Sequence, residues 1–238
     1  MKAPDLQCEG LVLSRPVKGG AFVDFSLPPG SAMVVVGRNG AGKSTLLHTV
    51  SGLLASKEGH VKVGGRPVHA MAARERAKWM SLVTSTPPKP PGLTVADVVA
   101  LGAKAGGRGL DARSLKAELE VAGIAQWAKM PLDTLSDGMA QRVMVARAGV
   151  QSKSVMLLDE PTAFLDLVGR EGVMSQLGRW KGEERILLVA THDLAAVAEA
   201  GWSTHWLHVH PGRGRGATLH EGPLDVEQAR TALRTDSV

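Results

Sequence analysis

Three short runs of apolar residues constrain the fold of this chain more than any other feature of its sequence. The runs are Met33–Val36, Val155–Leu158 and Ile186–Ala190, and none of them alternates with polar residues. Such continuous apolar runs are typical of strands that are covered on both faces in a parallel sheet. Each run leads into a polar turn and then a helix-like segment, so the sequence predicts an α/β fold of repeated strand–helix units.

Shorter strand-like segments near the N-terminus predict a second, smaller sheet. Leu11–Leu13, Phe22–Leu27 and His60–Val63 lie around the first apolar run, the last of them flanked by glycines. They are typical of antiparallel strands joined by turns, so we expect a small antiparallel β subdomain beside the main sheet. Near the C-terminus, Thr204–Val209 and Ala217–His220 flank the loop PGRGRG and predict two further strands, followed by a short helix.

The middle of the chain has a different pattern. The segment PPKPP, at 87–91, is stiff and polyproline-like. Helical patterns follow it at Thr94–Ala103, Ser114–Ala122 and Ser136–Val150, with glycine-rich breaks between them. This part of the chain is therefore predicted to be mostly helical.

At 238 residues the chain is long enough to bury a sizeable core. We expect a single domain over 1–238, whose α/β core consists of 1–85 and 151–238. A helical subdomain is inserted into this core over about 86–150.

Composition and charge narrow the functional classes. The net charge of +5 suits an anionic ligand, but Lys and Arg are scattered and tyrosine is absent, so we expect no nucleic-acid partner. No stretch approaches the roughly 18 apolar residues of a membrane-spanning helix, and the N-terminus lacks the apolar core of a secretory signal. The single cysteine, Cys8, excludes an internal disulfide and suits a reducing cytoplasm.

The first apolar run leads directly into GRNGAGKST, Gly37–Thr45, and then into the apolar segment Leu46–Val50. The pattern G-x-x-x-x-G-K-[ST] between a strand and a helix is that of a phosphate-binding loop, whose glycines let backbone N–H groups surround phosphate oxygens. In such a loop Lys43 bridges the β- and γ-phosphates and the Ser44 hydroxyl binds Mg²⁺. The candidate nucleotide-binding residues are Gly37, Arg38, Asn39, Gly40, Ala41, Gly42, Lys43, Ser44 and Thr45.

Polar side chains follow the other two apolar runs. The second run ends in Asp159 and Glu160, and the third is followed by His192. Ligands of open α/β sheets bind at the carboxyl ends of the strands, which is where these residues lie. We expect Asp159 to hold Mg²⁺, Glu160 to orient and polarise an attacking water, and His192 to reach the γ-phosphate.

These stretches, in this order, resemble the ATP-binding-cassette ATPases over nearly the whole chain. GRNGAGKST is similar to the Walker A motif, MLLDE to Walker B, THD to the H-loop and LSDGM to the signature, while AFLD, Ala163–Asp166, is similar to the D-loop. The resemblance implies two ATPase copies packed head to tail, each ATP lying between one chain's Walker A motif and the other's signature. In that arrangement Ser136 caps a helix, and N–H groups at its N-terminus, including that of Gly138, donate to the γ-phosphate.

The sequence departs from this family pattern in three places. Asp137 and Met139 replace a glycine and a glutamine of the signature, and we expect the Asp137 carboxylate to point to solvent. Ser85, with Thr84 beside it, stands where the family carries a glutamine that contacts Mg²⁺ and couples the core to a transport partner. No aromatic residue precedes Walker A to stack on adenine, and Arg15 is the candidate replacement.

The stretches GLTVADVVALGA and PTAFLD are similar to importer ATPases that serve iron–siderophore, haem or cobalamin uptake. This resemblance implies an ATPase at the cytoplasmic face of the inner membrane, with separate integral membrane permease subunits as partners. An extracytoplasmic substrate-binding protein would act indirectly through them. Two alternatives stay open: a soluble ATPase scaffold of the iron–sulfur-assembly type, and the ATPase of another transporter such as an exporter.

Histidines gather close to the C-terminus. His205, His208 and His210 lie near one another, and His220 faces them across the predicted hairpin. His208 and His210 share one face of the strand, with His205 on the other. Neutral imidazoles suit transition metals, but we interpret these residues as polar side chains of a half-exposed hairpin.

Overall fold

The computed structural model describes residues 3–13, 22–152, 154–210 and 216–236. The first half contains β1 (Leu6–Val12), β2 (Phe22–Leu27), β3 (Ala32–Val36), α1 (Lys43–Val50), β4 (Glu58–Val63), β5 (Arg66–Pro67), α2 (Ala73–Trp79), β6 (Met80–Val83), α3 (Val95–Ala105) and α4 (Ala112–Val121). The second half contains α5 (Asp137–Gln151), β7 (Val155–Asp159), α6 (Leu167–Gly182), β8 (Ile186–Ala190), α7 (Leu194–Ala200), β9 (His205–Val209), β10 (Ala217–Glu221) and α8 (Val226–Thr235). Short 3₁₀ turns lie at Val68–Ala70, Ala125–Trp127 and Leu132–Thr134.

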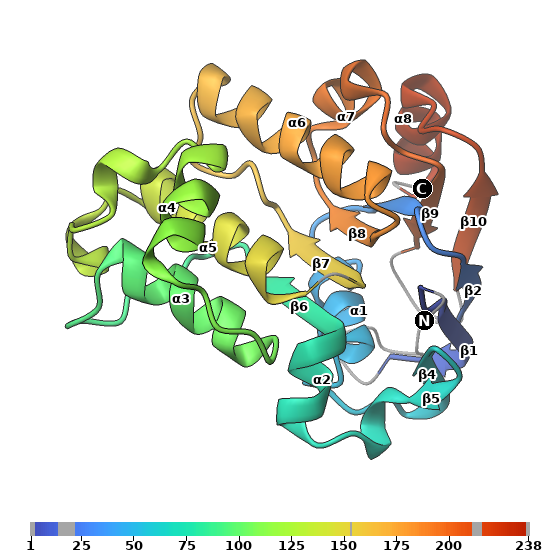
Figure 1. Cartoon of the computed structure of the whole chain (residues 1–238). Helices are drawn as coiled ribbons and strands as arrows, with labels where there is room; N and C mark the ends of the chain where they lie inside the picture. Colours follow the sequence, from blue (N-terminus) through green and yellow to red (C-terminus); the bar gives the residue numbers. More distant parts are fainter. Residues whose placement is uncertain (1–2, 14–21, 153, 211–215, 237–238) are drawn as a thin grey trace.

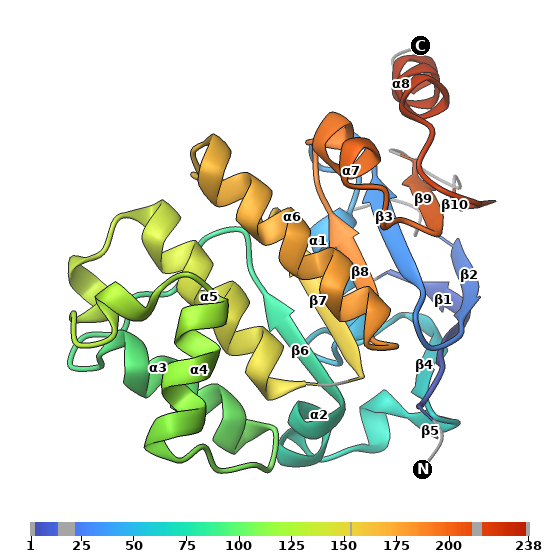
Figure 2. The same ribbon diagram turned by 45° about the horizontal axis from the view of Figure 1, so that its top comes forward.

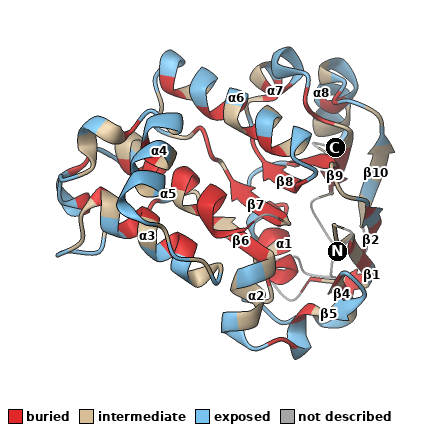
Figure 3. Ribbon diagram, viewed as in Figure 1, coloured by how far each residue is buried: buried red, intermediate tan, exposed pale blue. Residues whose placement is uncertain are grey.

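The three apolar runs form neighbouring strands at the centre of one sheet, as the sequence predicts. The strand order of this sheet is β10-β9-β3-β8-β7-β6, and its strands are parallel except for β10 at the edge. Successive residues of β3 belong to two different clusters of buried side chains, Val34 and Val36 to one and Met33 and Val35 to the other. The sheet is therefore buried on both faces, which explains why its strands lack polar alternation (Figure 3).

Different elements cover the two faces. On one face lie α1 and the antiparallel sheet, whose strand order is β2-β1-β4-β5. The helices α5, α6 and α7 lie on the other face (Figure 2). Their buried side chains belong to the cluster on that face. The predicted antiparallel subdomain is confirmed, but β1 begins at Leu6, five residues before the predicted start at Leu11.

The sequence did not predict β6 or the helix before it. α2 ends at Trp79, and Met80 is both its C-cap residue and the first residue of β6. No glycine or proline therefore marks the boundary between the two elements. β6 has only four residues and includes the buried polar residue Ser81. A short run without turn residues at its start carries little signal for a strand.

Three helices gather on one side of the central sheet, where α3 packs against α5 and α4 contacts both (Figure 1). Each lies within two residues of its predicted bounds. Their starts are capped by side chains: Thr94 and Asp97 form a capping box at α3, and Asp111 caps α4. Among the described residues, no helix is both long and apolar enough to cross a bilayer.

The C-terminal strands are not a half-exposed hairpin, so this prediction is wrong for β9. β9 pairs in parallel with β3 inside the central sheet, and four of its five residues are buried, including His208. β10 pairs with β9 in antiparallel fashion and is more exposed. The predicted terminal helix is α8, which ends beside β9.

Candidate functional site

The loop Gly37–Thr45 runs from the end of β3 to the first turn of α1. Gly42 precedes α1 with φ 107°, in the left-handed region that favours glycine, and no side chain caps this helix. The N–H groups of the first turn are thus left to bind a ligand, and the helix dipole favours an anionic one. Gly37 is required for a different reason, since a Cβ on it would lie 2.8 Å from the Val209 carbonyl oxygen.

Lys43 lies at the centre of the loop. Its Nζ donates to the Gly37 carbonyl at 2.9 Å and lies 3.2 Å from His192 Nε2. Burial lowers the pKa of Lys43, an effect that the charges of Glu160 and Asp159 partly oppose. A partly dehydrated ammonium group at the start of a helix is suited to bind phosphate oxygens.

Glu160 and His192 meet at the ends of β7 and β8. The Glu160 N–H donates to the Ala190 carbonyl at 2.8 Å, and Glu160 holds a φ of 48°. One carboxylate oxygen, Oε2, accepts from the His192 N–H at 3.2 Å. The other, Oε1, is buried 3.4 Å from His192 Nε2 and has no hydrogen-bond partner among the described residues. Oε1 is therefore an acceptor without a partner in the described part of the chain, and it is closed to solvent in this arrangement of the side chains.

These side chains face one open pocket of about 390 Å³. Asn39, Gly40, Gly42, Lys43, Ser44, Thr45, Ser85, Asp159, Glu160 and His192 line it. The Ser44 hydroxyl and the Asp159 carboxylate bring oxygen ligands to the same space, which is the donor set that Mg²⁺ prefers. When bound, Mg²⁺ would neutralise charge on the phosphates of a nucleotide.

Three of the predicted nucleotide-binding residues in the loop Gly37–Thr45 do not line the pocket. The Ala41 side chain is fully buried in the core. Gly37 contributes its carbonyl to Lys43. Arg38 is turned toward the C-terminus, where its Nη1 donates to the Asp236 carbonyl at 3.3 Å. Arg15, the predicted partner for adenine, lies outside the described residues.

The signature residues lie elsewhere. Ser136 caps α5, as predicted, with its Oγ accepting from the Met139 N–H at 3.2 Å. Gly138 packs against the segment after β7, because a Cβ on it would lie 2.4 Å from the Phe164 carbonyl oxygen. Neither Ser136 nor Gly138 is among the described residues that line the pocket around Lys43.

Asp137 is exposed in the single chain, but it is not an isolated carboxylate. Its Oδ1 lies 2.5 Å from Lys89 Nζ, and the same ammonium donates to the Leu135 carbonyl at 2.8 Å. Lys89 is the central residue of PPKPP. The proline-rich segment is thereby fastened to the start of the signature helix.

Gln141 is a residue that sequence reasoning missed. It is fully buried in α5, and its Nε2 donates at 3.3 Å to the carbonyls of both Thr84 and Glu160. The amide thus joins the segment that contains Ser85 to the backbone of the candidate catalytic carboxylate. A glutamine among buried helix positions is the signal that could have identified it, since buried polar groups require partners.

Comparisons with known proteins agree with this geometry. The family model described as "ABC transporter" matches residues 22–163. The chain is 37% identical over 179 residues to the iron(3+)-hydroxamate import ATP-binding protein FhuC of Bacillus subtilis, an alignment that covers 72% of this chain and 66% of FhuC. It is 34% identical over 213 residues to the achromobactin transport ATP-binding protein CbrD of Dickeya dadantii, covering 86% of this chain and 77% of CbrD.

A solved structure shares the fold. It is a dimeric post-hydrolysis state of the ATP-binding cassette MJ0796 bound to ADP and Pi, and it superimposes with a TM-score of 0.74 at 22% identity. The superposition covers 91% of this chain and 98% of that one. Fold, motif geometry and sequence similarity agree, and the chain belongs to the ATP-binding-cassette family as an ABC transporter ATPase.

Proposed function

We propose that this chain is the ATP-hydrolysing subunit of an importer that takes up a metal chelate of the iron–siderophore, haem or cobalamin type. The hydrolytic part of the proposal depends on one observation: Lys43, Glu160 and His192 from three separate segments meet in one pocket. The import part is supported by the similarity to FhuC and CbrD, which are named as import and transport ATP-binding proteins.

Five side chains of the pocket have roles that follow from their chemistry. Lys43 and the N–H groups of the loop bind the phosphates of ATP, and Ser44 and Asp159 hold Mg²⁺. The Glu160 carboxylate, which lines the pocket, orients the attacking water. His192 donates to the γ-phosphate from its position between Lys43 and Glu160.

A second copy of the chain completes the site. Ser136 and Gly138 do not line the pocket of their own chain, so their N–H donors serve an ATP held by the partner copy. The solved structure that shares this fold is a dimer bound to ADP and Pi, which supports the proposal that two copies act together. Phe164, Leu167 and Val168 form an exposed apolar stretch after β7 that is suited to the dimer interface.

Separate permease subunits bind beside the helical region, which we assign to about 86–150. Two neighbouring grooves support this assignment. The first contains Leu53 and Leu82, the second contains Leu93 and Leu101, and Met144 lines both. Leu53 and Leu101 are exposed, so the grooves offer apolar surface to helices of a membrane partner. The chain would therefore act at the cytoplasmic face of the inner membrane, and a substrate-binding protein outside would act through the permease.

Uptake by cells tests this function. Deleting the gene should abolish uptake of at least one labelled chelate among an iron hydroxamate, haem and cobalamin. The wild-type gene should restore uptake, and a gene with Glu160→Gln should not. A deletion strain that takes up all three chelates normally, but loses iron–sulfur enzyme activity or export of a compound, would support one of the two alternative functions instead.

A further inference from the structure

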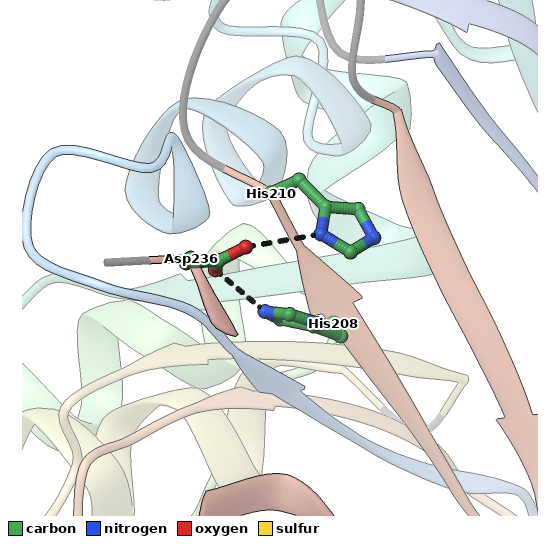
Figure 4. A group of neighbouring side chains, drawn as sticks. All are labelled: His208, His210 and Asp236. Atoms are coloured by element: carbon green, nitrogen blue, oxygen red, sulfur yellow. Dashed lines mark hydrogen bonds and ion pairs between the residues drawn. The ribbon is translucent and has the colours of Figure 1, made fainter. Parts of the chain in front are cut away.

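Asp236, the residue that caps the C-terminus of α8, brings a carboxylate to His208 in β9 and to His210, the residue after the end of β9. Asp236 Oδ2 lies 2.8 Å from His208 Nε2, and Asp236 Oδ1 lies 3.3 Å from His210 Nδ1 (Figure 4). Taking one ligand atom from each residue, all three atoms lie within 4.8 Å of one another. His208 and His210 are neighbours because they are two residues apart along the chain. Asp236 is 26 residues beyond His210 in the sequence, and it reaches both histidines because α8 ends beside β9.

The cluster is sheltered from water. The side chains of His208 and Asp236 are each 3% exposed, and that of His210 is 24% exposed. Burial lowers the pKa of His208, with a further lowering from the neighbouring His210, although the hydrogen bond to Asp236 opposes both effects.

A neighbouring strand orients the second histidine. His210 Nε2 lies 2.8 Å from the Thr218 hydroxyl, and Thr218 pairs with His208 across the β9–β10 ladder. Metal-binding histidines typically use their second ring nitrogen in this way, because the hydrogen bond fixes the tautomer and the direction of the ring. With Nε2 held by Thr218, Nδ1 points toward Asp236 (Figure 4).

We propose that His208, His210 and Asp236 bind a divalent transition-metal ion of the zinc class. Two imidazoles and one carboxylate are ligands that Zn²⁺ accepts, with water in the fourth position. Zinc–ligand bonds of about 2.0–2.1 Å place ligand atoms roughly 3.3 Å apart in a tetrahedron. The three ligand atoms lie within 4.8 Å of one another, so matching that spacing needs shifts of up to about 1.5 Å.

A metal ion at the proposed site would connect two parts of the fold. Asp236 caps the C-terminus of α8, and His208 belongs to β9 of the central sheet. The carbonyl of the same Asp236 accepts from Arg38, which belongs to the phosphate-binding loop. Bound metal would therefore hold the C-terminal helix beside that loop.

Calorimetric titration with Zn²⁺ tests the proposal on the full, tag-free chain without nucleotide. Excess Mg²⁺ keeps Zn²⁺ from the pocket formed by Ser44 and Asp159. We expect one saturable Zn²⁺ per chain, and a loss of affinity of at least tenfold in Asp236→Asn and in His210→Gln. His205→Gln is the matched control: His205 lies on the other face of β9 and hydrogen-bonds Thr204, so its loss should leave binding unchanged.

Thermal unfolding with and without Zn²⁺ distinguishes a metal site from a group of side chains that only hydrogen-bond to one another. Zn²⁺ should raise the Tm of the wild type and His205→Gln, and should leave the Tm of Asp236→Asn unchanged. Co²⁺ bound to the wild type should give the visible absorption of a four-coordinate ion. The proposal is overturned if no saturable heat is seen, or if Zn²⁺ binds and stabilises Asp236→Asn as it does the wild type.

Discussion

Lys89 and Asp137 form an ion pair of 2.5 Å that joins the proline-rich segment after β6 to the first turn of α5. In this chain Asp137 stands where related ATPases carry a glycine, so it brings a negative charge to a helix end that is proposed to face the partner's γ-phosphate. Lys89 offsets that charge. The departure in the signature and the lysine between the prolines are thus parts of one arrangement.

Replacing Lys89 with glutamine should weaken ATP-driven dimerisation, because the Asp137 carboxylate would then repel the incoming polyphosphate. The pair is partly exposed, so we expect the KM for ATP to rise by about fivefold or less. Adding Asp137→Asn should restore the wild-type KM, whereas Asp137→Asn alone should change it little. A Lys89→Gln variant with unchanged KM and dimerisation would show that Asp137 does not face nucleotide.

A methyl group at Gly138 should damage the contact between the signature and the segment after β7. The new Cβ would lie 2.4 Å from the Phe164 carbonyl oxygen, so α5 or that segment must shift. We expect Gly138→Ala to reduce ATPase turnover by at least about tenfold, the scale of a misplaced catalytic contact. Circular dichroism should show that the fold is retained.

The matched control for that variant is Gly172→Ala in α6, where a Cβ meets no atom within 4 Å. Alanine is favoured over glycine inside a helix by about 1 kcal/mol, so this variant should keep full activity and a Tm equal to or above that of the wild type. Equal ATPase activity in Gly138→Ala and Gly172→Ala would show that the contact between Gly138 and Phe164 is not needed for turnover.

Ser85 lines the pocket with Asp159 and Glu160, and its side chain is shorter than the glutamine that the family resemblance places there. Ser85→Gln should raise the Mg²⁺-dependent kcat, because a longer amide can reach the ion and the attacking water. Thr86→Gln, at an exposed neighbouring position, is the control and should leave kcat unchanged. If Ser85→Gln leaves kcat unchanged or lowers it, the missing glutamine does not limit turnover in this chain.

The sequence predicts those parts of the site that are made within one segment. Lys43 begins the helix that follows the first apolar strand, and Asp159 and Glu160 end an apolar run, so local pattern places them correctly. Contacts between segments that are distant in the sequence could not be predicted in this way. Lys89–Asp137, the two bonds of Gln141 and the approach of Asp236 to His208 depend on how helices and strands pack, which no local pattern encodes. For the same reason β9 could be predicted as a strand but not as a buried member of the central sheet.

The assignment of Glu160 as the residue that orients water is the central claim, and Glu160→Gln tests it most directly. The amide retains the size of the side chain but loses its basicity, so ATP should bind while turnover falls by at least about 100-fold. Light scattering after gel filtration should then show ATP-bound dimers of Glu160→Gln, whereas Lys43→Ala should stay monomeric because it cannot hold the phosphates. Hydrolysis by Glu160→Gln at the wild-type rate would contradict the account.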